Sequence, residues 1–474
     1  MSILNRLKYN LIGDKNFYRH VITILIPVII QNTITNVVSL VDNIMVGKIG
    51  TLQMSAVAFV NQLIFVFCLC IFGGLSGAGI FTSQFAGADD TEGIRNTFRM
   101  KIYIALTVSL LAIMVFSFFP NKLIGLYLSE NTSPGDAAAT LDFGLGYLYI
   151  MILGLIPFAV SQLYGSTLRE MGETKLPMVA SVVAILINVI FNYILIFGNT
   201  GLGFLPFAPL GVTGAAIATV LSRYAEMFII IICVHTNKLK YPFIKGVYST
   251  LKIPLRLCLQ IGQKGLPLLM NEFLWSFGMA ALMQCYSVRG IEVVAATNIT
   301  STVANIFNVV YFSMGTAVAI MCGQHLGAGR TEEAKTTVWR LLALTIAACI
   351  IMGSVLIVLS PYIPLVYNTS DYIRHLATRL LRIVAILMPF CAFCHCCYFA
   401  MRSGGRTVIT MIFDSGFIWL ISFPLAYFIA NFTSLPILPF YFAVQGVEAV
   451  KAVISGILIK KGFWINNIVA HKEV

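Results

Sequence analysis

The feature that most constrains this chain is its series of apolar segments, each long enough to cross a lipid bilayer. A membrane-spanning helix needs about 20 predominantly apolar residues, and segments of that length recur along the whole sequence. Of the 474 residues, 58% are hydrophobic and only 11% are charged, whereas a soluble chain has about a quarter charged residues. This excess of apolar residues suits lipid rather than water, so the sequence predicts an all-α integral membrane protein.

Twelve such segments can be distinguished, and each is predicted to form one transmembrane helix. Their approximate bounds are 19–45, 52–80, 97–118, 139–163, 176–198, 211–234, 262–286, 293–320, 338–359, 373–400, 407–430 and 439–458. No cleavable signal peptide is expected, because residues 1–20 are polar and basic and the following apolar run is too long for a signal core. The first helix is therefore expected to stay in the protein.

Positive charges gather at both ends of the chain and in alternate loops. They are Arg6, Lys8, Lys15 and Arg19; Arg95, Arg99 and Lys101; Arg169 and Lys175; Lys238, Lys240, Lys245, Lys252, Arg256 and Lys264; Arg330, Lys335 and Arg340; Arg402 and Arg406; and Lys460, Lys461 and Lys472. Cytoplasmic loops carry an excess of Lys and Arg, so both termini of this multi-pass cell-membrane protein are expected in the cytoplasm. This pattern also accounts for the net charge of +12, and no nucleic-acid partner is expected.

The two halves of the chain look like one unit used twice. Ser83-Gln-Phe-Ala-Gly-Ala88 is echoed by Gly323-Gln-His-Leu-Gly-Ala328, and Leu168-Arg-Glu-Met-Gly-Glu-Thr174 by Met401-Arg-Ser-Gly-Gly-Arg-Thr407. Six helices per copy give both copies the same orientation, with a cavity between them. The predicted division is an N-terminal six-helix lobe over 1–234, a basic cytoplasmic linker over 235–261 and a C-terminal six-helix lobe over 262–474.

Motifs in the first half resemble those of a known family. Val41-Asp-Asn-Ile-Met-Val-Gly47 is similar to a signature of the multidrug and toxic compound extrusion (MATE) transporters. So is Leu168-Arg-Glu-Met-Gly-Glu-Thr-Lys-Leu-Pro177, followed by Ile187-Asn-Val-Ile-Phe-Asn-Tyr193, although lipid-linked sugar flippases share this loop motif more loosely. The resemblance covers nearly the whole chain. It implies twelve transmembrane helices in two pseudo-symmetric six-helix lobes, alternating access, and export driven by sodium or protons.

Asp42 is the strongest candidate for a functional charge, because an ionisable group inside a membrane costs about 2.5–3.5 kcal/mol or more. Gln31, Thr35, Ser39 and Asp42 follow steps of four, four and three residues, so they share one helix face. Lipid does not solvate such a face, which is therefore expected to point into the lobe. Carboxylate, amide and hydroxyl oxygens suit sodium, or a carboxyl group that takes up a proton. A helix-end residue in the headgroup zone is the alternative.

The fifth and sixth predicted helices supply the expected partners of Asp42. Asn188 and Asn192 lie four residues apart and face one way. In the family, the counterpart of Asp42 takes part in ion coupling with positions on these helices, which match Asn188 and Thr219 here. Many members have an aspartate where this chain has Asn192, so the choice between Na+ and H+ stays open.

Glu272 is the candidate on the seventh helix, five residues after Pro267, which frees a backbone carbonyl and can bend the helix. Some branches of the family have a glutamate there, linked to substrate or coupling. Ser276, Met279 and Met283 continue the same face, and methionine suits permissive pockets. These four residues are predicted to bind substrate, and the alternative for Glu272 is a buried structural glutamate.

Other polar groups receive structural or open assignments. Glu226 and Glu448 are expected to pair with Arg223 and Lys451, while Asp414 is left without a role. The spacing of Cys391-Ala-Phe-Cys394-His395 matches a haem-attachment motif, and Cys396 and Cys397 add thiols that could bind zinc. Both interpretations fit poorly with an apolar helix after Pro389, so no metal is expected, and whether His395 titrates in the cavity stays open. At the place of Cys391 some sodium-coupled members carry an acid.

The sequence therefore predicts a transporter rather than an enzyme. We expect secondary active efflux of multiple drugs or organic cations by Na+ or H+ antiport, with no cofactor beyond the coupling ion. Small, cationic organic substrates and the lipid bilayer are the expected partners, and a monomer is the expected state. Three alternatives are a lipid-linked saccharide flippase, which would often have extra helices and a strongly cationic cavity, an uncoupled channel, and a membrane enzyme.

Overall fold

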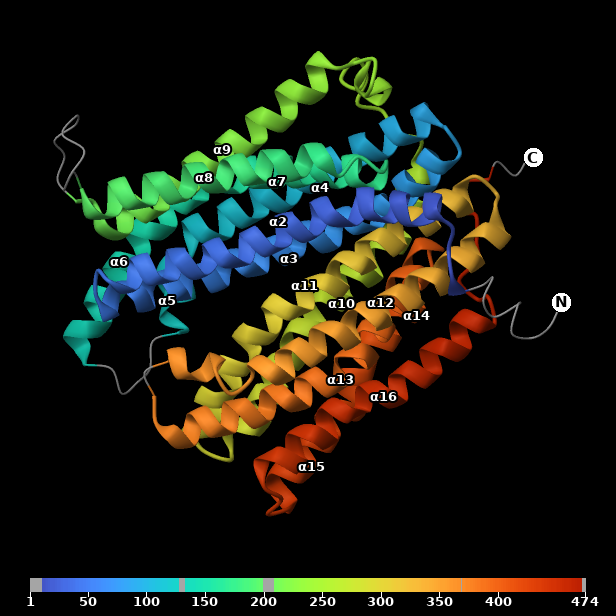
Figure 1. Cartoon of the computed structure of the whole chain (residues 1–474). Coiled ribbons are helices and arrows are strands. Elements are labelled where there is room, and N and C mark those ends of the chain that lie inside the picture. The colour runs from blue at the N-terminus through green and yellow to red at the C-terminus, as the bar shows by residue number, and fades with distance from the viewer. Residues whose placement is uncertain (1–10, 128–132, 199–208, 368, 471–474) are drawn as a thin grey trace.

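The computed structural model is all-helical and describes residues 11–127, 133–198, 209–367 and 369–470 (Figure 1). The first half contains α2 (Lys15–Gly47), α3 (Thr51–Gly87), α4 (Thr91–Phe118), α5 (Pro120–Gly125), α6 (Pro134–Ile152), α7 (Leu155–Glu170), α8 (Lys175–Phe197) and α9 (Gly211–Thr236). The second half contains α10 (Leu255–Ser287), α11 (Ile291–Gly327), α12 (Thr331–Leu359), α13 (Asp371–Ser403), α14 (Thr407–Met411), α15 (Phe423–Phe432) and α16 (Ile437–Lys460). Single 3-10 turns occur at Pro242–Ile244 and Ile363–Val366.

These elements confirm the predicted all-α membrane fold. In the described part of the chain, eleven helices are long and apolar enough to cross a bilayer, and α6 and α7, bent by 47° at a short break, add a twelfth if they count as one span. Several helices begin or end beyond the predicted bounds. For example, α4 starts at Thr91 because the side chain of Asp90 accepts a hydrogen bond from the Gly93 N–H and caps the helix. Polar caps of this kind lie outside the apolar run that hydropathy detects.

The helices gather into two groups that follow the order of the chain. Helices α2–α9 lie together and α10–α16 lie together, and α3 packs against α10 and α11 where the groups meet (Figure 1). One apolar core is built almost entirely from the first group, and three further cores are built mainly from the second. The start of α2 and the end of α16 lie at the same end of the molecule, here called the terminal face.

Residues 235–261, predicted as a linker, fold onto the first group. Phe243, Ile244 and Val247 are buried in its core, and the Arg99 Nε donates a hydrogen bond of 3.0 Å to the carbonyl of Val247. Helix α10 already begins at Leu255, inside this range. The basic side chains keep the segment polar while its apolar residues hold it to the membrane-embedded helices.

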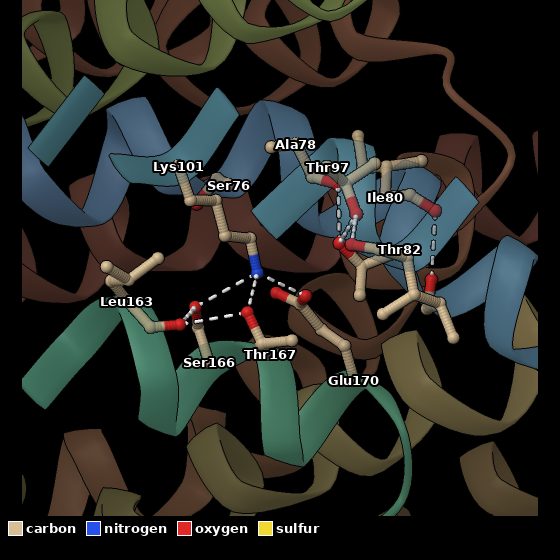
Figure 2. A network of polar contacts seen from close by, with 12 residues as sticks. Ser76, Ala78, Ile80, Thr82, Thr97, Lys101, Leu163, Ser166, Thr167 and Glu170 are labelled. Carbon is tan, nitrogen blue, oxygen red and sulfur yellow. Dashed lines mark hydrogen bonds and ion pairs between the residues drawn. The ribbon is translucent and has the colours of Figure 1, made fainter. Parts of the chain in front are cut away.

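One loop charge is placed differently from the prediction, because Lys101 is fully buried in α4. Its Nζ lies 2.5 Å from the Glu170 carboxylate and donates to Thr167 and Ser166 at 3.0 and 3.1 Å (Figure 2). A buried ammonium group requires such partners. Hydropathy counts Lys101 as a loop cation, since its partners are 65 to 69 residues away in the sequence. Arg6, Lys8 and Lys472 lie outside the described residues.

Glycine sets the approach of neighbouring helices, as small residues commonly do in membranes. A Cβ atom on Gly214 of α9 would lie 2.5 Å from the carbonyl oxygen of Leu195 on α8, whereas one on Gly446 of α16 would meet nothing within 4 Å. We therefore expect G214A to lower the free energy of unfolding by about 1–3 kcal/mol through overpacking, and G446A to be neutral or stabilising. Thermal unfolding of the purified protein in detergent measures both, and equal melting temperatures would contradict the packing described.

Candidate functional site

Asp42 lies in α2 beside the two asparagines of α8. The Asn192 Nδ2 donates a 2.7 Å hydrogen bond to the Asp42 Oδ1 and a 3.1 Å bond to the Asn188 Oδ1. The asparagines are 1% and 5% exposed, so the carboxylate is held by buried groups rather than by lipid headgroups. The prediction that these three side chains converge is confirmed by the geometry, although their role in ion coupling is untested by it.

Thr219 of α9 completes this arrangement. In one orientation of its amide, Asn188 donates from Nδ2 to the Thr219 Oγ1 at 3.3 Å. In the reversed orientation, the same amide nitrogen lies 3.1 and 3.2 Å from the two carboxylate oxygens of Asp42. The Asn192 Oδ1 is buried and has no hydrogen-bond partner among the described residues. The site therefore combines one carboxylate with amide and hydroxyl oxygens, and one of these, the Asn192 Oδ1, accepts no hydrogen bond from the described residues.

The remaining polar face of α2 contacts α8 and borders the cavity between the two helix groups. Gln31 donates to the Ser181 hydroxyl at 2.8 Å, and Ser181 donates to Glu226 at 2.5 Å. The hydroxyl of Thr35 donates to the carbonyl of Gln31, one turn earlier. Gln31 and Thr35 line the cavity described below, whereas the side chain of Ser39 lies outside the described part of the structure. Glu226 accepts its hydrogen bond from Ser181 and also interacts electrostatically with Arg169 and with the predicted Arg223.

A cavity of about 660 Å³ lies between the two helix groups. Its lining includes Gln31, Thr35, Phe72 and Arg169 from the first group, and Glu272, Trp275, Met279, Phe312, His395, Phe399, Arg402, Asp414, Glu448 and Lys451 from the second. Three acids and three permanent cations thus share one aromatic-rich chamber. Cavities of this size suit small organic molecules.

The ionisable residues of the second group form a connected cluster in this wall. The Lys451 Nζ lies 3.2 Å from Asp414 and 3.3 Å from Glu448, which confirms the predicted pairing of Glu448. Asn271 also donates to Asp414 at 3.1 Å. Asp414 lies in a π-helical turn, Ile412–Gly416, that joins α14 to the next π-helical turn, Ile418–Ser422, and α15, and such turns often occur at functional sites.

His395 is enclosed by aromatic rings at the same cavity. Its ring centre lies 5.4, 5.1 and 4.9 Å from those of Tyr311, Phe312 and Phe399. A Cβ on Gly315 would lie 2.8 Å from the imidazole, so this glycine makes room for the ring. Among the described residues, no three His, Cys, Asp or Glu side chains converge as a metal site.

The predicted substrate residues are divided by the structure. Glu272 and Met279 line the cavity. Ser276 is not among the lining residues, and Met283 packs against an apolar core of the second group, so a substrate role for these two stays a prediction without support from their positions. The 3.6-residue period places all four on one side of α10 but does not show how far along the helix the cavity extends.

Sequence reasoning missed the roles of three cations and one acid in this wall. The sequence predicts loop positions for Arg169 and Arg402, a structural pairing for Lys451 and no role for Asp414. Arg169 and Arg402 occupy equivalent positions of the internal echo, so the repeat contained a signal that both face a shared space. The partners of Asp414 are 37 and 143 residues away in the sequence, so local pattern could not identify them.

Comparison with known proteins gives consistent matches. The family model described as MatE matches residues 27–194 and 267–428. A probable multidrug resistance protein, NorM, of Thermotoga maritima is 20% identical over 459 residues, covering 96% of this chain and 95% of that protein. A second probable multidrug resistance protein, YoeA of Bacillus subtilis, is 25% identical over 439 residues, covering 92% of this chain and 91% of that protein.

Solved structures show the same fold. An outward-facing multidrug resistance MATE transporter aligns with a TM-score of 0.81 at 18% identity, covering 95% of this chain and 96% of the other. A mutant of the Vibrio cholerae MATE transporter VcmN aligns with a TM-score of 0.82 at 17% identity, covering 94% and 97%. Identity as low as this is enough to compare the architecture but not the individual side chains.

The Lys451 cluster makes a prediction about stability. K451M leaves Asp414 and Glu448 without their shared cation, and we expect it to lower the free energy of unfolding by about 1–3 kcal/mol, less than for a fully buried pair because both acids face the cavity. The double variant K451M/D414N removes one charge of each sign and should recover part of the loss. Thermal unfolding in detergent tests this, and a K451M protein that melts like the parent would show that the pair contributes no stability.

Proposed function

The chain belongs to the MatE family, and from this premise we propose that it is a secondary active exporter of small organic cations that takes up Na+ or H+ in exchange. A multi-pass membrane protein with a MATE-like fold has the architecture for such transport. The curated relatives are named as probable multidrug resistance proteins, which supports drug-like substrates. The observation that carries the proposal is the chain of hydrogen bonds that joins Asp42 to Asn192 and Asn192 to Asn188 inside the helix bundle.

The Asp42 site suits a cation that comes and goes. Its carboxylate and the unpaired Asn192 oxygen, with the Thr219 hydroxyl nearby, are hard-oxygen ligands of the kind that sodium binds, and a carboxyl group can instead take up a proton. Either cation would neutralise Asp42 and weaken its hydrogen bond from Asn192. Because α2 contacts α8 and also α11 of the other group, a change at Asp42 can alter how the two groups pack.

We propose that the two halves move as lobes, 1–234 and 262–474, with 235–261 as their link. The transporter alternates between a state that binds substrate and a state that releases it. Cation binding favours the releasing state because the cation has a higher affinity for that state, which is the only way a ligand can shift such an equilibrium. Exchange of one monovalent cation for another moves no net charge, so the concentration gradient of the coupling ion drives export, and a tenfold ion gradient, worth about 1.4 kcal/mol, supports a tenfold substrate gradient. We propose a monomer as the transporting unit, with a cavity wall built from both helix groups of the one chain, and the basic terminal face supports cytoplasmic termini.

The charge of the cavity favours this function over the flippase alternative. Arg169, Arg402 and Lys451 are balanced by Glu272, Asp414 and Glu448, so the wall is not strongly cationic. Trp275, Phe312 and Phe399 add ring faces that attract organic cations. A chamber with paired charges and aromatic faces suits cationic amphiphiles better than an anionic lipid-linked phosphate.

The role of Asp42 is tested by D42N, which keeps the shape of the side chain but removes its charge. Gradient-driven efflux from sealed vesicles should fall to the level of vesicles without the transporter, because no cation can be exchanged. D142N, at an exposed acid of α6, is the matched control and should transport normally. Imposing a sodium gradient and a pH gradient separately identifies the ion, and undiminished efflux by D42N under both would refute the proposal.

Glu272 is tested by E272Q. If this carboxylate attracts the positive group of the substrate, the apparent affinity for cationic substrates should fall about tenfold, or about 1.4 kcal/mol, while neutral substrates are little affected. Concentration-dependent efflux of a panel of dyes and drugs of different charge measures the change. An identical substrate profile in the parent and E272Q would leave Glu272 with a structural role.

A further inference from the structure

The two groups of helices cross most closely beyond the cavity, at the terminal face, through two glycines of the internal repeat. A Cβ on Gly87 of α3 would lie 1.9 Å from the carbonyl oxygen of Gln324, and one on Gly327 of α11 would lie 1.8 Å from that of Gln84. These distances leave no room for any side chain. The repeated Gln-x-x-Gly segments of α3 and α11 are therefore in direct backbone contact.

Each glutamine of this crossing binds the opposite half of the protein. The Gln84 Nε2 donates to the carbonyl of Ser403 at 2.8 Å, and the Gln324 Nε2 donates to the carbonyl of Glu170 at 3.1 Å. Glu170 and Ser403 are equivalent positions of the second sequence echo, as Gln84 and Gln324 are of the first. The two hydrogen bonds are thus one interaction made twice, once from each half.

These bonds lie directly below the substrate cavity. Arg169 and Arg402 line the cavity, and each is followed in the chain by the residue whose carbonyl a glutamine binds, Glu170 or Ser403. A molecule in the cavity could leave through the terminal face only if the carbonyls and the glutamines separated. We infer that Gln84 and Gln324 are the gate residues that close the cavity at the terminal face and that must release together for this side to open.

The two sides of the gate are held in different ways. On the first half, the Glu170 carboxylate is paired with Lys101, whose Nζ also donates to Thr167 and Ser166 (Figure 2). A Cβ on Gly79 would lie 2.3 Å from its carboxylate, so the side chain is packed against α3. The ion pair therefore ties the end of α7, which carries the carbonyl bound by Gln324, to α4.

On the second half, residues 463–470, which follow α16, hold the gate through hydrogen bonds to Gln84 and Gly327. The Gln84 Nε2 also donates to the carbonyl of Asn466 at 3.1 Å, and its Oε1 accepts from the Ile468 N–H at 2.8 Å. Asn467 donates to the carbonyl of Gly327 at 3.2 Å. Ile468 packs on the core of the first group, while Trp464 is buried in a core of the second. This segment therefore joins both halves across the gate. Among the described residues, the side chain of Gln84 makes three hydrogen bonds and that of Gln324 makes one.

The inference rests on the alternating access proposed above, but it can be tested without substrate or ion gradient. Cys391 lines the cavity, so a membrane-impermeant maleimide applied to one side of sealed vesicles reports whether that side is open. Labelling of the Cys391 peptide is quantified by mass spectrometry for the full-length parent, Q84A, Q324A and the double variant. Q263A, at an exposed glutamine near the start of α10, is the matched control.

We expect labelling from the terminal face to rise about fivefold in Q324A, which loses one hydrogen bond, and further in Q84A and in the double variant. Labelling from the opposite side should fall, because the two open states compete. Unchanged labelling from the terminal face, or an equal rise from both sides, would overturn the inference, the second outcome showing that the glutamines only stabilise the fold.

Two controls keep the result interpretable. If Q84A does not reach the membrane, N467A, which removes one hydrogen bond between residues 463–470 and α11, should raise labelling from the terminal face, and parental labelling would contradict the gate. D42N separates this test from the proposed coupling. Undiminished efflux by D42N would overturn the proposed coupling alone, whereas failure of the glutamine variants to change labelling would overturn the gate alone.

Discussion

The structure depends on how a carboxylate is accommodated inside a bundle of membrane-spanning helices. Asp42 would be costly facing lipid, and it is instead turned toward Asn192, which donates to it at 2.7 Å from a fully buried position. The same helix face carries Gln31 toward α8, while Asn32 donates to Ser313 of α11. One polar face of α2 therefore links the candidate ion site to both groups of helices, and this linkage makes coupling between ion and substrate physically reasonable.

Two further clusters show that other charges inside the helix bundle also have partners. Lys101 is held by Glu170, and Lys451 by Asp414 and Glu448. The two clusters differ in position. The first fixes a backbone carbonyl next to the terminal face, whereas the second lines the cavity. In the proposed mechanism one ion pair therefore lies beside the gate and the other lies in the wall of the cavity.

Much of the fold and part of the site could be predicted from the sequence. Apolar runs of bilayer length predicted the helices. The four-residue spacing of Asn188 and Asn192 put both on one helix face, and the family resemblance implied that this face meets Asp42. What could not be predicted depends on contacts between distant segments. Lys101 is predicted as a loop cation because its partner Glu170 is distant in the sequence. The partners of Asp414, Lys451 and Asn271, are also distant. Met283 shares a helix face with Glu272 but packs away from the cavity. Periodicity identifies the face of a helix, but not which neighbour covers each turn of it.

The central claim is that a cation at Asp42 and the substrate in the cavity influence each other's binding. The most direct test is to measure the substrate dissociation constant of the purified transporter at a series of sodium concentrations and, separately, of pH values. The account predicts that the constant rises with the concentration of the coupling ion in the parent and becomes independent of it in D42N. Persistence of the same ion dependence in D42N would contradict it, because the ion would then act elsewhere.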